Sequence, residues 1–267
     1  MTDNLIRNPD GFGPGYNAIT QADDPSDVVQ MDFGILNLAA GESWSSEAGL
    51  EAAYLLMDGT LALSCGEIEV TVSRGSIFDE EPIALHHDAS ATATLKAESA
   101  CEVAIFRTAN DTRFDTKLFD RESMLESEHR GQGLLNDTAY RIVRTIFDGR
   151  NRPDARLVLG EVINFPGRWS SYPPHHHAQP EIYHYRFTQP QGYGHGELGD
   201  EVHKVRQFDT IKILDDNDHS QVAAPGYGMY YIWGIRHLPG NPYTVPEFTD
   251  EHRWVMKPDA DVWKPTS

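Results

Sequence analysis

Three consecutive histidines stand near the middle of the chain, in the segment SSYPPHHHAQPEIYHYRF (residues 170–187). Side chains alternate between the two faces of a β-strand, so His175 and His177 share a face while His176 points the other way. Two imidazoles at positions i and i+2 of one strand can bind the same metal ion. Glu181 follows just after a proline that interrupts the strand, and its carboxylate can supply a third ligand. The pattern therefore predicts a divalent metal site.

A fourth ligand is expected from a loose internal repeat of the sequence. GESWSSEAGLEAAYLLMDG in the first half corresponds to GRWSSYPPHHHAQPEIYHYRF in the second, and similar strand-like segments follow each. In this correspondence Glu51 falls opposite Glu181, and both His86 and His87 fall opposite His219. We therefore expect His219 to be the fourth ligand. Because the first half lacks the His-x-His element, we expect a single metal, in the second half.

Three neutral imidazoles and one carboxylate leave positions on a divalent cation for exchangeable ligands, which is typical of a catalytic site. Zinc is the ion that we favour, and manganese, iron and nickel would accept the same ligands. We expect the remaining histidines of this half to be surface or otherwise satisfied residues, namely His184, His195, His203, His237 and His252.

Many short β-rich runs separated by turn signals must position these residues. Runs rich in Ile, Val, Tyr and Trp occur at residues 50–78, 102–106, 156–165, 209–214 and 229–235. Helical periodicity is weak, and the best short helix is expected over residues 120–129, with Asp120 as its N-cap. This pattern predicts an all-β protein, built as a sandwich or a barrel.

The internal repeat predicts two similar β-barrel lobes. We expect an N-terminal lobe without metal at residues 1–110, a polar linker at 111–155, and a C-terminal lobe with the metal site at 156–267. The 267-residue length, with 39% hydrophobic and 10% aromatic residues, is sufficient for such a globular core.

The formal net charge of −19 argues against nucleic acid and anionic lipid as partners, because both would be repelled. No apolar run approaches the roughly 20 residues that span a membrane, and no basic segment followed by an apolar core marks a secretory signal. Cys65 and Cys101 have no ligand-like spacing and are expected to be free thiols. A cytoplasmic location is therefore expected.

Four segments carry a family resemblance. They are FPGRWSSYPPHHH (165–177), PEIYHYRFTQPQGYG (180–194), HSQVAAPGYGMYYIWGIRH (219–237) and GQGLLNDTAYRIVRTIFD (131–148). Together they resemble the 5-deoxy-glucuronate isomerase family of inositol catabolism, within the cupin superfamily. The resemblance implies a bicupin fold and an aldose–ketose isomerase that converts 5-deoxy-glucuronate to 5-dehydro-2-deoxy-gluconate. It also implies metal ligands at His175, His177, Glu181 and His219.

Two departures from the family pattern keep other substrates open. The gap between His177 and Glu181 is shorter than in many members of the inositol branch. It is nearer to the sister branch, the 5-keto-4-deoxyuronate isomerases of pectin breakdown. His184 also stands where the inositol branch usually has tyrosine. One alternative is therefore the pectin-derived ketouronate as substrate. A redox cupin acting as a dioxygenase or decarboxylase is a second, because three histidines and one glutamate also suit iron or manganese. A non-catalytic sugar-binding cupin is a third.

An aldose–ketose isomerase needs a base, a Lewis acid and, for a sugar acid, a cation that binds the carboxylate. The candidates for proton transfer are Glu181, Tyr183 and Tyr185, since all three share the inward face of one strand. Arginine binds carboxylates in two parallel hydrogen bonds, and the candidates near the site are Arg168, Arg186 and Arg236. The expected partner is a small sugar acid, and homo-oligomer formation is expected because barrel faces commonly associate.

Overall fold

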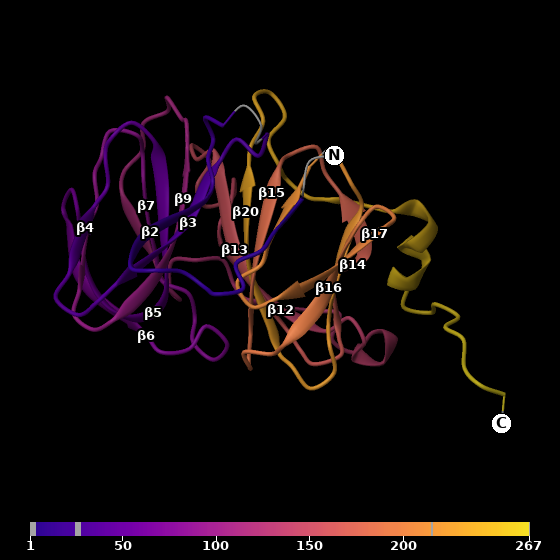
Figure 1. Ribbon diagram of the computed structural model, residues 1–267. Coiled ribbons are helices and arrows are strands. Elements are labelled where there is room, and N and C mark those ends of the chain that lie inside the picture. Colours follow the sequence, from indigo (N-terminus) through magenta and orange to yellow (C-terminus); the bar gives the residue numbers. More distant parts are fainter. Residues whose placement is uncertain (1–3, 25–27, 215, 267) are drawn as a thin grey trace.

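Antiparallel β-strands form nearly all of the regular structure of the chain. The computed structural model describes residues 4–24, 28–214 and 216–266. Two lobes lie side by side, the first built mainly from the N-terminal half and the second from the C-terminal half (Figure 1). The all-β class and the two barrel lobes agree with the prediction. No helix within the described ranges has the length and apolar character needed to cross a membrane.

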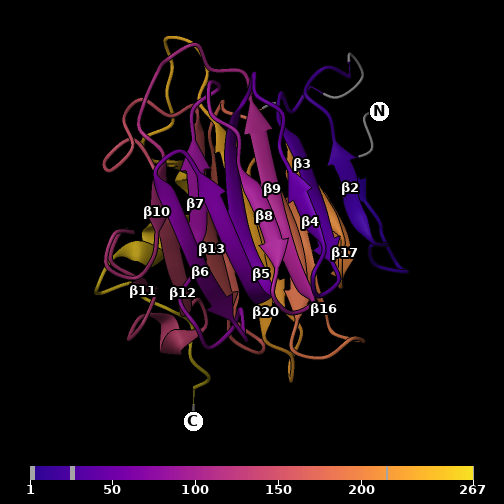
Figure 2. The ribbon, with the colours of Figure 1, turned by 90° about the vertical axis from the view of Figure 1, so that its left-hand side faces the viewer.

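The first lobe contains one main sheet in the order β10-β7-β5-β9-β3-β2. The long strand β5 continues beyond this sheet to pair with β6 and β8, and β4 pairs with β8. Figure 2 shows these strands face-on, with the second lobe behind them. The bounds are β2 (Gly15–Thr20), β3 (Asp32–Leu38), β4 (Ser43–Ser45), β5 (Glu51–Cys65), β6 (Ile68–Arg74), β7 (Ala84–His87), β8 (Thr94–Ala97), β9 (Cys101–Thr108) and β10 (Lys117–Phe119).

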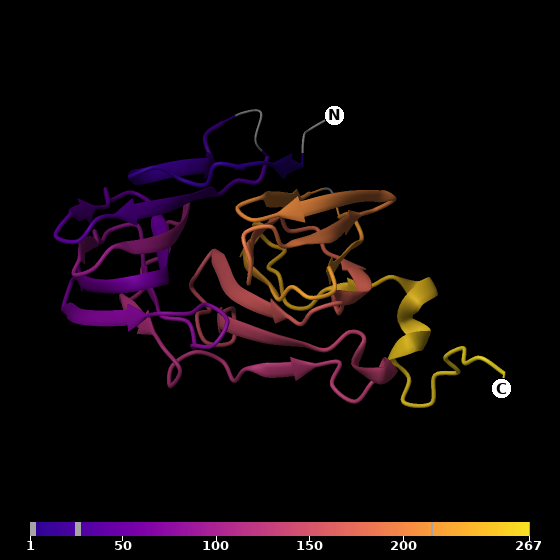
Figure 3. The ribbon, with the colours of Figure 1, turned by 60° about the horizontal axis from the view of Figure 1, so that its bottom comes forward.

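The second lobe contains two sheets, with the orders β1-β18-β15-β20-β13-β12-β11 and β17-β16-β19-β14-β21. Figure 3 shows them wrapped around a common interior. The bounds are β1 (Leu5–Ile6), β11 (Glu128–Arg130), β12 (Arg141–Phe147), β13 (Leu157–Asn164), β14 (Trp169–His176), β15 (Glu181–Phe187), β16 (Tyr193–Leu198), β17 (Glu201–Arg206), β18 (Thr210–Ile213), β19 (His219–Ala223), β20 (Met229–Arg236) and β21 (Glu247–Phe248), with the 3₁₀-helices η1 (Leu135–Asp137) and η2 (Asp250–Met256).

The lobe boundaries differ from the predicted ones. Residues 111–155, expected as a linker, supply β10 to the first lobe and both β11 and β12 to the second. The N-terminal strand β1 pairs with β18 and so belongs to the second lobe. Residues 1 and 267, the outer ends of the predicted lobes, lie outside the described residues.

The helix expected over residues 120–129 is instead a turn followed by β11. The Asp120 carboxylate caps that turn, accepting hydrogen bonds from the backbone amides of Glu122 and Ser123. The capping chemistry was therefore identified correctly, but no helix follows it.

Three apolar cores hold the molecule together: one inside each barrel and one between the lobes. Strand alternation distributes the side chains, so Ile182 enters the core between the lobes while Tyr183 enters the second barrel. The lobes approach closely at Gly234, where an added Cβ would lie 2.4 Å from Cε1 of Phe106. Packing of this kind fixes the second barrel against the first.

A buried ionic cluster centred on Glu161 joins the lobes. Arg74 from the first lobe donates to Oε1 of Glu161 at 2.7 Å, and Arg144 donates to the same oxygen at 2.9 Å. The other carboxylate oxygen accepts from the Tyr230 hydroxyl at 2.7 Å. All four residues are buried, so the charge of Glu161 is compensated without water.

Candidate metal centre

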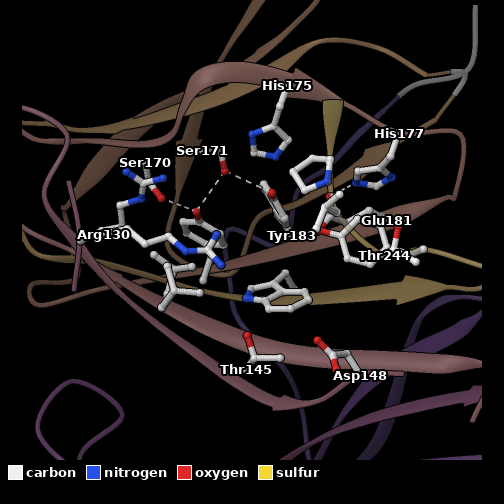
Figure 4. Close-up of a pocket in the computed structure, with 18 of the residues that line it drawn as sticks. Arg130, Thr145, Asp148, Ser170, Ser171, His175, His177, Glu181, Tyr183 and Thr244 are labelled. Atoms are coloured by element: carbon white, nitrogen blue, oxygen red, sulfur yellow. Dashed lines mark hydrogen bonds and ion pairs between the residues drawn. The ribbon is translucent and has the colours of Figure 1, made fainter. Parts of the chain in front are cut away.

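His177, Glu181 and His219 meet inside the second barrel. Figure 4 shows His177 and Glu181 at one side of the cavity. One ligand atom from each residue lies within 4.8 Å of the others. Nε2 of His177 lies 3.1 Å from Oε2 of Glu181, and Nε2 of His219 lies 3.5 Å from the same oxygen. His177 follows β14, Glu181 begins β15 and His219 begins β19, so both sheets of the barrel contribute. All three residues are buried.

Backbone carbonyls orient the two imidazoles. Nδ1 of His177 donates to the carbonyl of Gln179 at 2.9 Å, and Nδ1 of His219 donates to the carbonyl of Asn217 at 3.1 Å. In a neutral imidazole a proton on Nδ1 leaves the lone pair on Nε2. Both Nε2 lone pairs therefore face the carboxylate of Glu181. Partners of this kind commonly fix the tautomer of metal-binding histidines.

The donor set fits a divalent cation. Nε2 of His219 is buried and has no hydrogen-bond partner within the described ranges. Burial lowers the pKa of His219 to about 4, against the opposing influence of the Glu181 carboxylate. The imidazole is therefore neutral near pH 7, and the neutral form is the one that binds metal.

His175 lies beside this group of three. Its ring centroid is 4.4 Å from that of His219, and it lines the same cavity. Nδ1 of His175 is buried and without a partner in the described part of the chain. Burial, followed by the neighbouring His219 and His177, holds the pKa of His175 well below its usual range. Its role as a fourth ligand stays a prediction.

The cavity in front of the histidines carries a connected group of hydroxyls. Ser171 shares hydrogen bonds with Tyr183 at 3.2 Å and with Tyr231 at 3.4 Å, and Tyr231 also contacts the hydroxyl of Ser170. Ser171 has a φ of 53°, in the left-handed region. This interrupts strand alternation, so both consecutive serines reach Tyr231. The sequence pattern alone does not indicate that Tyr231, Ser170 and Ser171 belong to this group of hydroxyls.

The two predicted catalytic tyrosines lie in different surroundings. Tyr183 lines the cavity beside Glu181. Tyr185 lies deeper in the barrel, where its hydroxyl donates to Oε1 of Gln221 at 2.6 Å. Tyr185 is fully buried and is not among the residues that line the cavity. Of the two, Tyr183 is therefore the one placed to contact a substrate.

The three arginines expected to bind a carboxylate lie away from the cavity. Arg168 donates to the carbonyl of Asn136, and Arg186 forms an ion pair with Glu102 of the first lobe. Arg236 donates to the hydroxyl of Thr108. The arginines that do line the cavity are Arg130, Arg141 and Arg150, which all come from the segment expected to be a linker.

Trp233 forms part of the cavity wall, and a glycine makes room for it. A Cβ at Gly160, the cross-strand neighbour of Trp233, would lie 2.2 Å from an indole carbon. The wall also includes Thr145 and Asp148 from the end of β12 and the residue following it (Figure 4).

The segment after β20 covers the outer side of the histidines. The ring of Tyr243 lies 4.9 Å from that of His177, in an edge-to-face arrangement. The side chain of Gln179 donates to the carbonyl of Asn241 at 2.8 Å and so holds this segment against the site.

Glu51 and His86, which the internal repeat relates to Glu181 and His219, contact each other on the side of the first lobe that faces the second lobe. Glu51 lies on the side of β5 that carries Ala53, which packs in the core between the lobes. Its carboxylate contacts Nε2 of His86 at 2.9 Å and accepts hydrogen bonds from the backbone amides of Arg156 and Leu157. Glu51 therefore joins the lobes, whereas Glu181 faces a barrel interior.

Known structures share this fold. An IolB-like protein from Salmonella typhimurium LT2 superimposes with a TM-score of 0.84 at 20% identity, covering 96% of this chain and all of the other. Oxalate decarboxylase from Lactobacillus farciminis superimposes with a TM-score of 0.69 at 10% identity, covering 97% of this chain and 91% of the other. A cupin barrel protein from Leptotrichia buccalis also matches, with a TM-score of 0.50. The bicupin architecture is thus confirmed.

Curated relatives match along most of the chain. The 5-deoxy-glucuronate isomerase of Shouchella clausii is 26% identical over 249 residues, which cover 85% of this chain and 88% of the relative. The enzyme of the same name from Bacillus subtilis strain 168 is 25% identical over 254 residues, which cover 87% of this chain and 90% of the relative. The model of the KduI/IolB family matches residues 5–255. The chain therefore belongs to the KduI/IolB family.

Proposed function

We propose that this protein is a metal-dependent aldose–ketose isomerase that converts 5-deoxy-glucuronate to 5-dehydro-2-deoxy-gluconate in inositol catabolism. The observation that carries the proposal is the convergence of His177, Glu181 and His219 beside a cavity that is lined by hydroxyls and arginines. Relatives along most of the chain are named 5-deoxy-glucuronate isomerase, which supports an isomerase of this substrate class.

His177, Glu181 and His219 would hold the metal, with His175 as the neighbouring fourth donor. A divalent ion bound there would polarise the carbonyl oxygen of a hydroxy-carbonyl substrate. The backbone carbonyls that accept from both Nδ1 atoms keep the imidazoles aimed at that position. Zinc remains the favoured ion, since two or three imidazoles with one carboxylate are common zinc ligands.

The isomerisation moves a proton between adjacent carbons, and Glu181 is placed to take it. Oε2 of Glu181 faces both histidines, which leaves Oε1 as the oxygen available to a carbon-bound proton. The side chain of Tyr183 lines the same cavity as this carboxylate, and its hydroxyl is hydrogen-bonded to Ser171. We assign two roles to Tyr183. Its hydroxyl donates a hydrogen bond to the substrate oxygen and exchanges a proton with it.

An assay with purified protein tests this function. Metal content is measured by atomic emission, and conversion of 5-deoxy-glucuronate is followed by NMR before metal removal, after it, and after zinc or manganese is restored. We expect conversion only in the metal-loaded states, and equally without oxygen. If the metal-loaded protein leaves 5-deoxy-glucuronate unchanged but converts 5-keto-4-deoxyuronate, the substrate belongs to the pectin branch. Turnover that consumes oxygen would replace the isomerase with a redox cupin.

A further inference from the structure

Two of the three arginines that line the cavity already have carboxylate partners. Arg130 donates to both oxygens of Glu128, at 2.9 and 3.1 Å, and both side chains are over 40% exposed. Arg150 donates to Asp148 at 2.8 Å, and its side chain is 64% exposed. Neighbouring acids therefore neutralise these two positive charges.

Arg141 differs from the other two in burial and in pairing. It is 8% exposed, and its Nη1 donates to the carbonyl of Ala139 at 2.8 Å. Its Nε is buried with no hydrogen-bond partner among residues 4–24, 28–214 and 216–266, and no carboxylate of these residues lies within 4.0 Å of its guanidinium. A guanidinium stays protonated in proteins, so Arg141 is a buried positive charge that lacks an anion.

The position of Arg141 within the cavity follows from strand register. It lies opposite Arg130 across the β11–β12 pair. Figure 4 places Arg130 across the cavity from His177 and Glu181, with Tyr183 and Ser171 between them. Arg130 thus lies across one cavity from His177 and Glu181, and Arg141, its cross-strand neighbour, lines the same cavity.

We infer that Arg141 binds the carboxylate of the substrate and makes the site selective for sugar acids over neutral sugars. This rests on the proposed isomerase and adds the residue that determines its substrate class. The planar guanidinium matches a carboxylate through two parallel hydrogen bonds. A substrate held this way presents its other end, with the reacting carbonyl, to His177 and Glu181.

The overall charge makes such a local cation necessary. The chain carries a net charge of −19, and Asp148 and Glu181 add two carboxylates to the cavity wall. A sugar acid is therefore repelled at long range. A desolvated and unpaired guanidinium offsets this repulsion more effectively than an exposed and already paired one, because its attraction is less screened.

Substrate selectivity provides the first test. R141M and R141K are compared with wild type and with R113M, which changes an exposed arginine of the first lobe. Each is assayed with 5-deoxy-glucuronate and with 5-deoxy-glucose, in which an alcohol replaces the carboxylate. In R141M we expect kcat/KM for the acid to fall about 100-fold, mainly through KM, while the value for the alcohol changes less than about threefold. R141K should retain part of the preference, since lysine keeps the charge but loses the two-bond geometry. Unchanged preference for the acid in R141M overturns the inference.

Binding without turnover separates this inference from the proposed reaction. D-gluconate, a carboxylate without a reacting carbonyl, is titrated into each metal-loaded protein by calorimetry. Wild type and R113M should bind it about 100-fold more tightly than R141M. If wild type does not isomerise 5-deoxy-glucuronate but gluconate binding still depends on Arg141, the reaction fails and the carboxylate site stands. Equal gluconate binding in wild type and R141M overturns the site itself.

Thermal stability distinguishes a binding role from a structural one. Replacing an uncompensated buried cation by methionine removes a desolvated charge, so the melting temperature of R141M should equal or exceed that of wild type. A lower melting temperature together with wild-type gluconate affinity would identify Arg141 as a structural residue.

Discussion

Nε2 of His177 lies 3.1 Å from Oε2 of Glu181, although His177 follows β14 of one sheet and Glu181 begins β15 of the other. The short turn between β14 and β15 carries the chain from one sheet to the other. It therefore brings an imidazole and a carboxylate to one point within five residues of sequence.

Removing either partner should remove the metal. We expect purified H177A and E181Q to contain little metal and to show no isomerase activity, since the loss of one proposed ligand greatly lowers metal affinity. The matched control is H176A, because the imidazole of His176 pairs with Asp218 at 2.7 Å and not with Glu181. Atomic emission and circular dichroism measure metal content and folding. Full metal occupancy in H177A would mean that the ion binds elsewhere.

Tyr183 should contribute to turnover rather than to stability. Y183F removes a hydroxyl from the cavity that Glu181 also lines but keeps the aromatic ring, so we expect kcat to fall by about 100-fold with an unchanged melting temperature. Y193F, on the outer hairpin of the second lobe, serves as the control. If Y183F turns over at the wild-type rate, proton exchange with the substrate oxygen does not use this hydroxyl.

The carboxylate of Glu161 should be essential to the contact between the lobes. E161Q leaves Arg74 buried without its anion, while Arg144 keeps its ion pair with Glu81. We expect the change to cost about 3 kcal/mol of unfolding free energy. E98Q, which breaks an exposed pair with Lys96, should cost less than about 1 kcal/mol. Urea unfolding measures both. Equal losses in the two variants would show that the buried cluster adds nothing beyond a surface ion pair.

Stability should fall with acid because His86 is buried in its neutral form. Arg152 donates to Nδ1 of His86 at 3.0 Å, so the proton of the neutral ring is on Nε2 and points to Glu51. Burial, with a further contribution from the charge of Arg152, lowers the pKa of His86 below its usual 6.5. Below pH 6.5 the unfolded chain therefore binds more protons than the folded one, and stability is lost as pH falls.

Comparison with a variant isolates this effect, because other buried histidines, including His184 and His237, also have lowered pKa values. Urea unfolding of the metal-free protein at pH 7.5 and 5.5 should show a smaller pH dependence in H86Q than in wild type, by up to about 1.4 kcal/mol. Identical pH dependence in the two proteins would exclude His86 as a contributor.

Sequence alone predicted the all-β lobes and the grouping of His177, Glu181 and His219. Ligand types and strand alternation were enough to select His177 and Glu181, and the internal repeat selected His219. The same repeat failed for Glu51, because a shift of one residue on a strand moves a side chain to the opposite face. The carboxylate that seemed equivalent to Glu181 consequently faces the other lobe.

The cationic end of the cavity could not be found in the same way. Nearness in sequence to the histidines favours other arginines. Strands β11 and β12 instead bring Arg130 and Arg141 to the cavity from a segment expected to be a linker. The β-branched residues of RIVRTIF (141–147) were the available signal for a strand. Arg141 and the histidines are some 35 residues apart in the sequence. Sheet topology brings them to one cavity, and a single sequence does not reveal that topology.

The pairing of β1 with β18 has a consequence for how the chain folds. Leu5 lies opposite Ile211, so two residues about 200 positions apart complete one edge of the second barrel. The chain between them includes the whole first lobe, which can fold as soon as its own strands are made. Contacts at such separation form slowly, because a long loop must close first. We therefore expect the β1 edge to be completed last, only after the ribosome has released β18.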